Sequence, residues 1–304
     1  MIQSRIIIIT KLNKVTTYLF QDFHSVKESK WLRRLLYAFL LFKCSYWLID
    51  VSIFFGDQNI ISKSEVHVSF FKSLTYLLFN CDKVICAYAF LFLALLLGLN
   101  GLFFKFLPRL SAFVIWFLVC NINNAVYPSL TAGDFLFQQL LFFNIFLSGC
   151  IPHQSNQKGI VSSARMDLDK ALHNFGVIAI KIQICLVYFI SGLSKLLDYD
   201  WIHGKAIAQI FRIEDFGIPY LYENAWKHPG IAKLLDSVVI IYQLAFAVLL
   251  SYKNIKKWYL VFGIVQHLYI AFVMGLPTFG FIMIIAYSIF YIPVKKSILS
   301  VESV

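Results

Sequence analysis

The chain has 304 residues, of which 60% are hydrophobic and 14% are charged, and its mean hydropathy is +0.73. Soluble domains average about 45–50% apolar and about 25% charged residues, so this composition excludes an ordinary soluble protein and predicts a polytopic membrane protein. The net charge of +11 does not indicate nucleic-acid binding, because lysines and arginines of membrane proteins gather in cytoplasmic loops.

The apolar segments predict an all-α integral membrane bundle of about eight transmembrane helices, each near the roughly 20 residues that span a bilayer. The expected spans are 34–56, 84–103, 110–127, 134–151, 174–197, 231–251, 257–274 and 277–294. The last two spans form one apolar block. We divide it at Gly275-Leu276-Pro277, because glycine and proline together mark a tight turn.

The basic residues predict the orientation of these helices. With a cytoplasmic N-terminus, the inner segments carry seventeen of the 27 lysines and arginines and the outer loops carry six. The positive-inside rule therefore predicts that both termini are cytoplasmic. The expected organisation is a basic cytoplasmic N-terminal segment at 1–33, a transmembrane domain at 34–294 and a cytoplasmic tail at 295–304, with outer loops at 57–83 and 198–230.

The cysteines and common catalytic motifs say little about function. Six cysteines are scattered, mostly within apolar stretches, where a thiol packs as a small hydrophobe. Cys81 and Cys86 lie near one membrane edge, and the spacing leaves open whether they pair. The sequence has no Walker loop, His-Glu-x-x-His, Cys-x-x-Cys or glycine-rich nucleotide fingerprint. No metal site is predicted.

Lys195 is the most informative polar residue, because it ends a long apolar segment. A lysine at the centre of a membrane helix costs about 2.5 to 3.5 kcal/mol. Lys195 either snorkels to the outer interface or serves as a buried amine that acts as a base or binds an anion. Lys43 and Asp50 share one face of the first expected helix, and we interpret them as packing groups with partners on other helices.

Other polar groups are expected in the same outer half of the membrane. Three asparagines end the third expected helix, an aspartate opens the fourth and another follows the fifth, and a histidine lies in the seventh: Asn121, Asn123, Asn124, Asp134, Asp198 and His267. Asp134 also suits a helix N-terminus, and a lone helical histidine often only bonds a neighbour. Their convergence from four helices favours one cavity that opens to the outside.

The run Gln183-Ile184-Cys185-Leu186-Val187-Tyr188-Phe189-Ile190-Ser191-Gly192-Leu193-Ser194-Lys195, followed by Asp200-Trp201 and Gly204, resembles the membrane domain of vitamin K-dependent gamma-glutamyl carboxylase. It is also similar to the bacterial HTTM proteins related to that enzyme. Asn123-Asn124 and the segment from His267 to Gly275 and Phe279 match in the same order, and the resemblance covers roughly residues 31–293. It implies that Lys195 is an active-site base near a reduced quinone, with His267 and the asparagines lining the pocket.

Two features depart from the carboxylase. Ala125 stands where the carboxylase has a histidine after its paired asparagines, and these 304 residues contain no large luminal domain. The size is closer to the single-domain HTTM proteins that help to mature secreted bacterial peptide toxins, of the type that matures the sporulation-delaying protein. That resemblance implies a multi-pass protein of the bacterial inner membrane that contacts lipid, a secreted precursor peptide and a small accessory protein.

Three functions follow as alternatives. The first is maturation or modification of a secreted, toxin-like peptide in an outward-facing pocket. The second is a quinone-dependent oxygenase or carboxylase. The third is a protein without chemistry that binds lipid or peptide, confers immunity or transports a small solute. The expected catalytic residues are Lys195 and His267, and the expected substrate-binding residues are Asn123, Asn124, Asp134, Asp198 and Trp201. The cofactor stays open, with a reduced quinone as the candidate.

Overall fold

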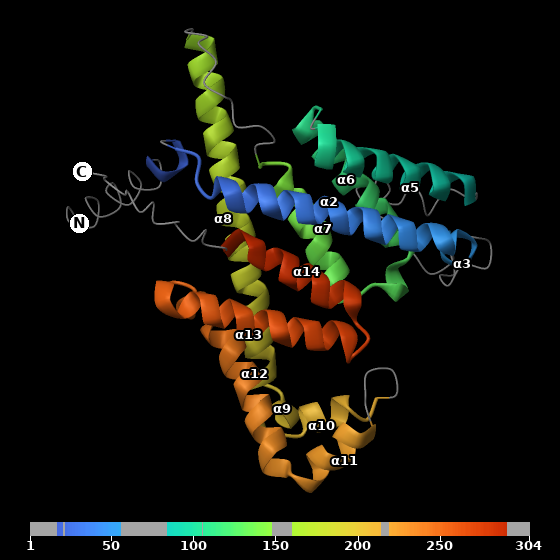
Figure 1. The fold of residues 1–304 in the computed structure, drawn as a ribbon, viewed down its shortest axis with the longest axis vertical. Coiled ribbons are helices and arrows are strands. Elements are labelled where there is room, and N and C mark those ends of the chain that lie inside the picture. The colour runs from blue at the N-terminus through green and yellow to red at the C-terminus, as the bar shows by residue number, and fades with distance from the viewer. Residues whose placement is uncertain are drawn as a thin grey trace, which may run out of the picture.

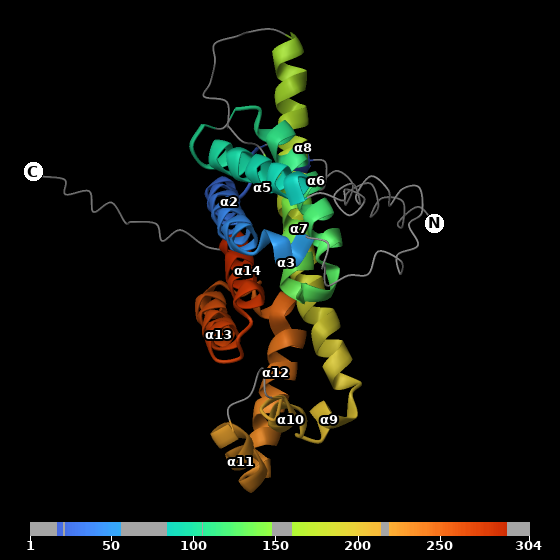
Figure 2. The ribbon, with the colours of Figure 1, turned by 90° about the vertical axis from the view of Figure 1, so that its right-hand side faces the viewer.

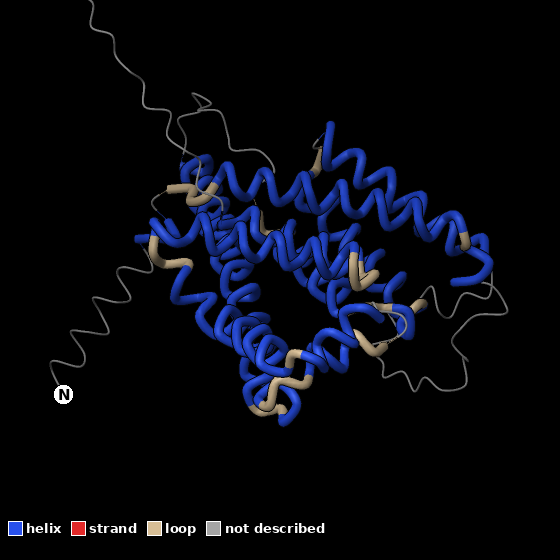
Figure 3. The backbone as a smooth tube through the Cα atoms, turned by 60° about the horizontal axis from the view of Figure 1, so that its bottom comes forward, coloured by secondary structure: helices blue, strands red, loops and turns tan. Residues whose placement is uncertain are grey.

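The structure is a computed structural model that describes residues 17–20, 22–55, 84–104, 106–147, 160–213 and 219–290. Throughout these ranges the secondary structure is helical, without strands (Figure 3). The elements are α2 (Val26–Ile49), α3 (Val51–Phe55), α5 (Val84–Leu99), the π-helical turn η3 (Asn100–Phe104), α6 (Pro108–Ala125), η4 (Tyr127–Ser129), α7 (Ala132–Asn144), α8 (Ile160–Leu196), α9 (Tyr199–Ile202), α10 (Ala206–Ile210), α11 (Pro219–Lys227), α12 (Pro229–Leu249), α13 (Lys253–Phe272), α14 (Pro277–Tyr287) and η5 (Ser288–Phe290).

Helix α8 runs along most of the length of the molecule, and α12 returns beside its C-terminal half (Figures 1 and 2). Helices α2, α5, α13 and α14 run across α8 (Figure 1). A helix lies at each of the eight expected positions, but α8 begins at Ile160 rather than at 174, because the helix continues into polar residues before the apolar stretch. The expected outer loop 57–83, the tail 295–304 and most of the segment 1–33 fall outside the described residues.

Within the described ranges, three helices are long and apolar enough to cross a membrane: Val84–Phe104, Ala164–Leu196 and Pro229–Leu249. The share of their most apolar stretches that is buried inside the protein is only 22%, 33% and 28%, respectively. Most of this apolar surface therefore faces outward, which is unfavourable in water by about 25 cal/mol per Å² but not in lipid. We conclude that the chain is an all-α membrane protein.

Two helix breaks shape the transmembrane part. The first expected span, 34–56, is interrupted at Asp50, where α2 gives way to the short α3. The last two expected spans separate at Gly275-Leu276-Pro277, as predicted, because α13 ends at Phe272 and α14 begins at Pro277. Gly275 has a φ of 70°, which glycine adopts without steric cost, and a proline at the first helical position loses no hydrogen bond.

The expected outer loop 198–230 contains three short helices, α9, α10 and α11, at one end of α8 and α12 (Figures 1 and 2). Asp236 of α12 attaches α10 to the long helices. Its fully buried carboxylate accepts hydrogen bonds from the backbone N–H groups of Ala206, at 3.2 Å, and Ile207, at 3.1 Å. The segment is therefore fixed against α12, which its description as an outer loop did not predict.

The cysteines divide into paired and free thiols. Cys86, near the start of α5, is disulfide-bonded, and its partner lies outside the described residues. Cys44, Cys120 and Cys185 are free, as expected for thiols that pack within apolar stretches.

A close contact between α8 and α12 at Gly192 leads to a stability prediction. A Cβ atom at this position would lie 3.0 Å from the Cβ of Gln243 and from side-chain atoms of Leu244. We expect Gly192→Val to force the helices apart and to lower the free energy of unfolding by about 1–3 kcal/mol. Thermal unfolding of the detergent-solubilised protein measures this effect. Gly230→Val is the matched control, because nothing lies within 4 Å of its added Cβ. Equal unfolding midpoints for the two variants would contradict the contact.

Candidate functional site

A cavity of about 650 Å³ lies between α8, α12, α13, α14 and the segment that carries α9 and α10. Its volume is within the roughly 300–1,000 Å³ of small-molecule pockets. Its wall is mostly aliphatic and aromatic, with a limited set of polar residues: Tyr188, Ser191, Lys195, Gln243, Gln266, His267 and Tyr269. The cavity thus combines an apolar surface with a few polar groups, as binding sites do.

Helix α8 contributes one polar wall. Tyr188, Ser191 and Lys195 line the cavity because spacings of three and four residues place side chains on the same helix face. The Lys195 ammonium donates a hydrogen bond to Ser191 Oγ at 2.8 Å and lies 5.0 Å from the centre of the Trp201 ring. Lys195 is half-buried and also lines a second pocket of about 470 Å³ along α8. Its ammonium group is therefore accessible from two pockets.

Asp198 holds the turn that carries Trp201. It is the N-cap of α9, and its carboxylate accepts hydrogen bonds from the backbone N–H groups of Asp200, at 2.9 Å, and Trp201, at 3.2 Å. Such caps stabilise a helix start by about 1 kcal/mol. Asp198 itself is exposed and is not part of the cavity wall, so it orients the turn that carries Trp201.

Helix α13 contributes the opposing polar group, His267, which is only 4% exposed. Its Nε2 lies 2.6 Å from the hydroxyl of Tyr188, which in turn bonds the hydroxyl of Tyr287. The Tyr287 hydroxyl also lies 3.0 Å from the hydroxyl of Tyr242. His267 is thus held through one ring nitrogen by a chain of phenols, while its Nδ1 has no hydrogen-bond partner within the described part of the chain.

Four buried polar atoms on this cavity wall lack a partner among the described residues: Gln243 Oε1, Gln266 Oε1, His267 Nδ1 and Tyr269 Oη. A buried polar atom left unpaired costs about 1–3 kcal/mol, and such atoms are rare in folded proteins. All four belong to residues around this one cavity. The described residues contain no group of three histidine, cysteine, aspartate or glutamate side chains that could hold a metal ion.

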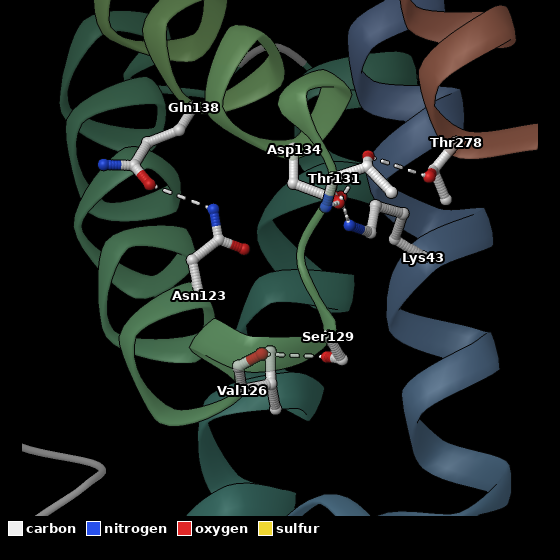
Figure 4. A network of polar contacts seen from close by, with 8 residues as sticks. All are labelled: Lys43, Asn123, Val126, Ser129, Thr131, Asp134, Gln138 and Thr278. Carbon is white, nitrogen blue, oxygen red and sulfur yellow. Dashed lines mark hydrogen bonds and ion pairs between the residues drawn. The ribbon is translucent and has the colours of Figure 1, made fainter. Parts of the chain in front are cut away.

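A second polar cluster surrounds Asp134 at the start of α7 (Figure 4). Asp134 and Thr131 form a capping box, in which the Asp134 carboxylate accepts from the Thr131 backbone N–H at 2.7 Å and from its hydroxyl at 2.9 Å. The same carboxylate pairs with the buried ammonium of Lys43, which lies 4.4 Å from the centre of the Trp47 ring. Lys43 therefore packs against a partner on another helix, as interpreted from the sequence.

Of the expected asparagines, Asn123 lies near this second cluster (Figure 4). Asn123 donates a hydrogen bond from its side-chain amide to Gln138 Oε1 at 2.9 Å (Figure 4), and Asn124 is half-buried at the end of α6. The expected single cavity is thus divided: Lys195, Trp201 and His267 share the 650 Å³ cavity, whereas the expected residues on α6 and α7, Asn123, Asn124 and Asp134, do not line it. Helix α14 connects the two regions, because Thr278 contacts Thr131 at 3.3 Å and its neighbour Phe279 lines the cavity.

Several lining residues were not identified from the sequence. Tyr188, Gln243, Gln266 and Tyr269 lie in apolar helices, where a tyrosine or glutamine is readily interpreted as a packing residue. A usable signal was the helical spacing, since Tyr188 falls one turn before Ser191 and two turns before Lys195.

Comparison with known proteins yields two similar chains. "Sporulation-delaying protein SdpB" of Bacillus subtilis (strain 168) is 26% identical over 196 residues, which are 63% of this chain and 60% of that protein. "Uncharacterized protein YitO" of the same organism is 20% identical over 200 residues, 63% of each chain. The matched part spans less than two thirds of both relatives.

No family model and no solved structure matches the chain. The similarity to SdpB agrees with the expected relation to sporulation-delaying proteins. Membership of the HTTM family, and the relation to the carboxylase, stay predictions.

The buried Lys43–Asp134 pair yields a stability prediction. Lys43→Met leaves a buried carboxylate without its cation, which we expect to cost about 3–5 kcal/mol. Adding Asp134→Asn removes that charge while its amide oxygen can still accept from Thr131, so the double variant should be more stable than Lys43→Met alone. Thermal unfolding in detergent tests this order. A double variant no more stable than the single one would refute the ion-pair role.

Proposed function

We propose that the protein is a multi-pass protein of the bacterial inner membrane that takes part in the maturation or modification of a secreted, toxin-like peptide. The cavity that carries Lys195 and His267 is the site at which the peptide binds, and it opens to the outer side. The observation that carries this proposal is the set of unpartnered polar atoms on an otherwise apolar cavity wall. Similarity to a protein named for delaying sporulation supports the choice of a peptide.

The proposed topology has eight transmembrane helices and two cytoplasmic termini. The strong bias of basic residues toward the inner segments supports it. The helices at the expected positions in the chain also support it, although α2, α5, α13 and α14 run across α8 and not beside it (Figure 1). The disulfide at Cys86 supports an outer location for the start of α5, because disulfides persist in oxidising compartments. The same topology places α9, α10 and α11 on the outer side.

The chemistry available in the cavity comes from two side chains. The Lys195 amine, held by Ser191 and Trp201, can bind a carboxylate or stabilise negative charge that develops on a substrate oxygen. His267 can accept or donate a proton at its unpartnered ring nitrogen. The apolar wall excludes water, which strengthens both interactions. A precursor peptide and a small accessory protein are the proposed partners, with lipid around the outward-facing helices.

Replacement of Lys195 tests this function. We expect Lys195→Ala to abolish formation of the mature peptide in cells while membrane expression is unchanged, because the cation in the cavity is lost. Lys227→Ala is the control, since Lys227 is an exposed lysine on α11 that only approaches Glu223. Mass spectrometry of the secreted peptide gives the readout. Normal maturation by Lys195→Ala would refute the proposal.

Two further variants separate chemistry from binding. Loss of product in both Lys195→Gln and Lys195→Leu would indicate that the amine itself is required. Activity in Lys195→Gln but not in Lys195→Leu would instead indicate a polar contact, as expected of a protein that binds peptide or lipid without chemistry.

The apolar, aromatic part of the wall supports a second candidate, a quinone-dependent oxygenase or carboxylase. Trp201, Phe211 and Phe279 fit the flat ring of a naphthoquinone, although Ala125 is buried in α6 and does not line the cavity. When bound and reduced, such a quinone would supply electrons for reaction with oxygen. Lys195 and Trp201 would hold it in place.

Tryptophan fluorescence tests whether the cavity binds a quinone. We expect menadione to quench the emission of the purified protein with saturation, because Trp201 lines the cavity, and Trp201→Phe to remove most of the saturable part. Trp258→Phe is the control, since Trp258 is 70% exposed and lies outside the cavity. Quenching that does not saturate, or that Trp201→Phe leaves unchanged, would exclude this candidate.

A further inference from the structure

We propose that a chain of three tyrosines fixes the tautomer of His267, so that its Nδ1 accepts a hydrogen bond from a backbone N–H group of the peptide in the cavity. The inference deepens the proposed function and rests on it for the identity of the ligand.

The chain begins at a backbone carbonyl. The Tyr242 hydroxyl donates to the carbonyl oxygen of Tyr259 at 3.5 Å and lies 3.0 Å from the hydroxyl of Tyr287. Tyr287 contacts the hydroxyl of Tyr188, which lies 2.6 Å from His267 Nε2. The three phenols come from α8, α12 and α14, and the histidine from α13. All four residues are at least 96% buried, so the chain is shielded from solvent.

Counting protons along the chain gives its direction. The carbonyl of Tyr259 can only accept, so its contact with Tyr242 is a hydrogen bond only when the proton of Tyr242 points to it. Each phenol has a single proton, so Tyr287 must donate to Tyr242, and Tyr188 must donate to Tyr287. The remaining contact needs a proton from the histidine. All four contacts are therefore hydrogen bonds at the same time only when His267 donates from Nε2 to Tyr188.

A neutral imidazole that carries its proton on Nε2 has a lone pair on Nδ1. In His267 this atom is buried without a partner among the described residues, in a side chain that lines the cavity. The ring thus presents an acceptor, and the matching ligand group is an N–H donor. The carboxamides of Gln243 and Gln266 on the same cavity each hold a donor and an acceptor. That pair complements the N–H and C=O of a peptide bond, and Lys195 complements a carbonyl or carboxylate oxygen.

Glycine at position 263 permits the chain to form. A Cβ there would clash with the hydroxyls of Tyr242 and Tyr287, so any other residue would displace both phenols. This close approach of the α13 backbone places the histidine-bearing helix directly against the tyrosines.

Nitrogen-15 NMR of the full-length protein in lipid, labelled on histidine and recorded at a pH where histidine is neutral, tests the tautomer. The His267 signals are identified by their loss in His267→Asn. We expect His267 to show a protonated Nε2 and an unprotonated Nδ1. Tyr242→Phe should convert this single tautomer into a mixture, because the chain loses its link to the carbonyl. Tyr259→Phe is the control, since it keeps the backbone carbonyl. A proton on Nδ1 in the wild type, or no change in Tyr242→Phe, would overturn the inference.

The binding of two peptide probes tests whether a backbone N–H group of the ligand pairs with His267 Nδ1. The probes are acetyl-Leu-Leu-Leu-amide and its counterpart methylated at every backbone nitrogen, which lacks those N–H donors. We expect the methylated probe to bind the wild type about tenfold more weakly. Asn places its amide near the position of histidine Nδ1, and Gln places its amide near Nε2. His267→Asn should therefore keep the preference and His267→Gln should lose it.

Equal affinities of the two probes in the wild type, no binding of either, or a preserved preference in His267→Gln would each overturn the assignment of a peptide N–H to Nδ1. These outcomes are distinct from failure of the proposed function. Normal maturation by Lys195→Ala would refute the maturation role, yet it would leave the tautomer and the probe affinities as measured.

Discussion

A polar group inside a membrane protein has no water to bind, so a partner on a neighbouring helix must stabilise it. Most buried polar groups described here obey this constraint. Arg33 of α2 donates to the side-chain oxygen of Asn144 at 3.0 Å, Lys43 pairs with Asp134, and Asp236 accepts two backbone N–H groups. These contacts determine which helices lie side by side, because each partner comes from a different element.

Around the cavity, only some of the buried polar atoms have a hydrogen-bond partner on a neighbouring helix. His267 satisfies one ring nitrogen through Tyr188, while Nδ1 and the nearby amide oxygens of Gln243 and Gln266 have no partner within the described residues. The Asp134 carboxylate is fully paired by contrast, although Asn123 Oδ1 near it also lacks a partner among the described residues. Residues around the cavity hold four of the seven buried unpaired atoms found among the described residues.

The arrangement also explains how the short helices after α8 contribute to the site. Asp198 caps α9 and orients the turn that bears Trp201, and Asp236 fixes α10, whose Ile207 and Ile210 line the cavity. Lys195 therefore lies between a rigid long helix and an anchored surface segment.

The sequence by itself determined the class of protein, the helical positions and the break before Pro277, and it singled out Lys195, Trp201 and His267, which line one cavity. Hydropathy and the spacing of polar residues report how far along a helix a side chain lies. They do not report which neighbour the side chain faces, so Asn123, Asn124 and Asp134 were expected beside Lys195 because all lie at a similar depth. Only the tertiary structure decided that Asp134 faces Lys43 and that His267 meets three tyrosines from three other helices, because those contacts depend on how the helices rotate and cross.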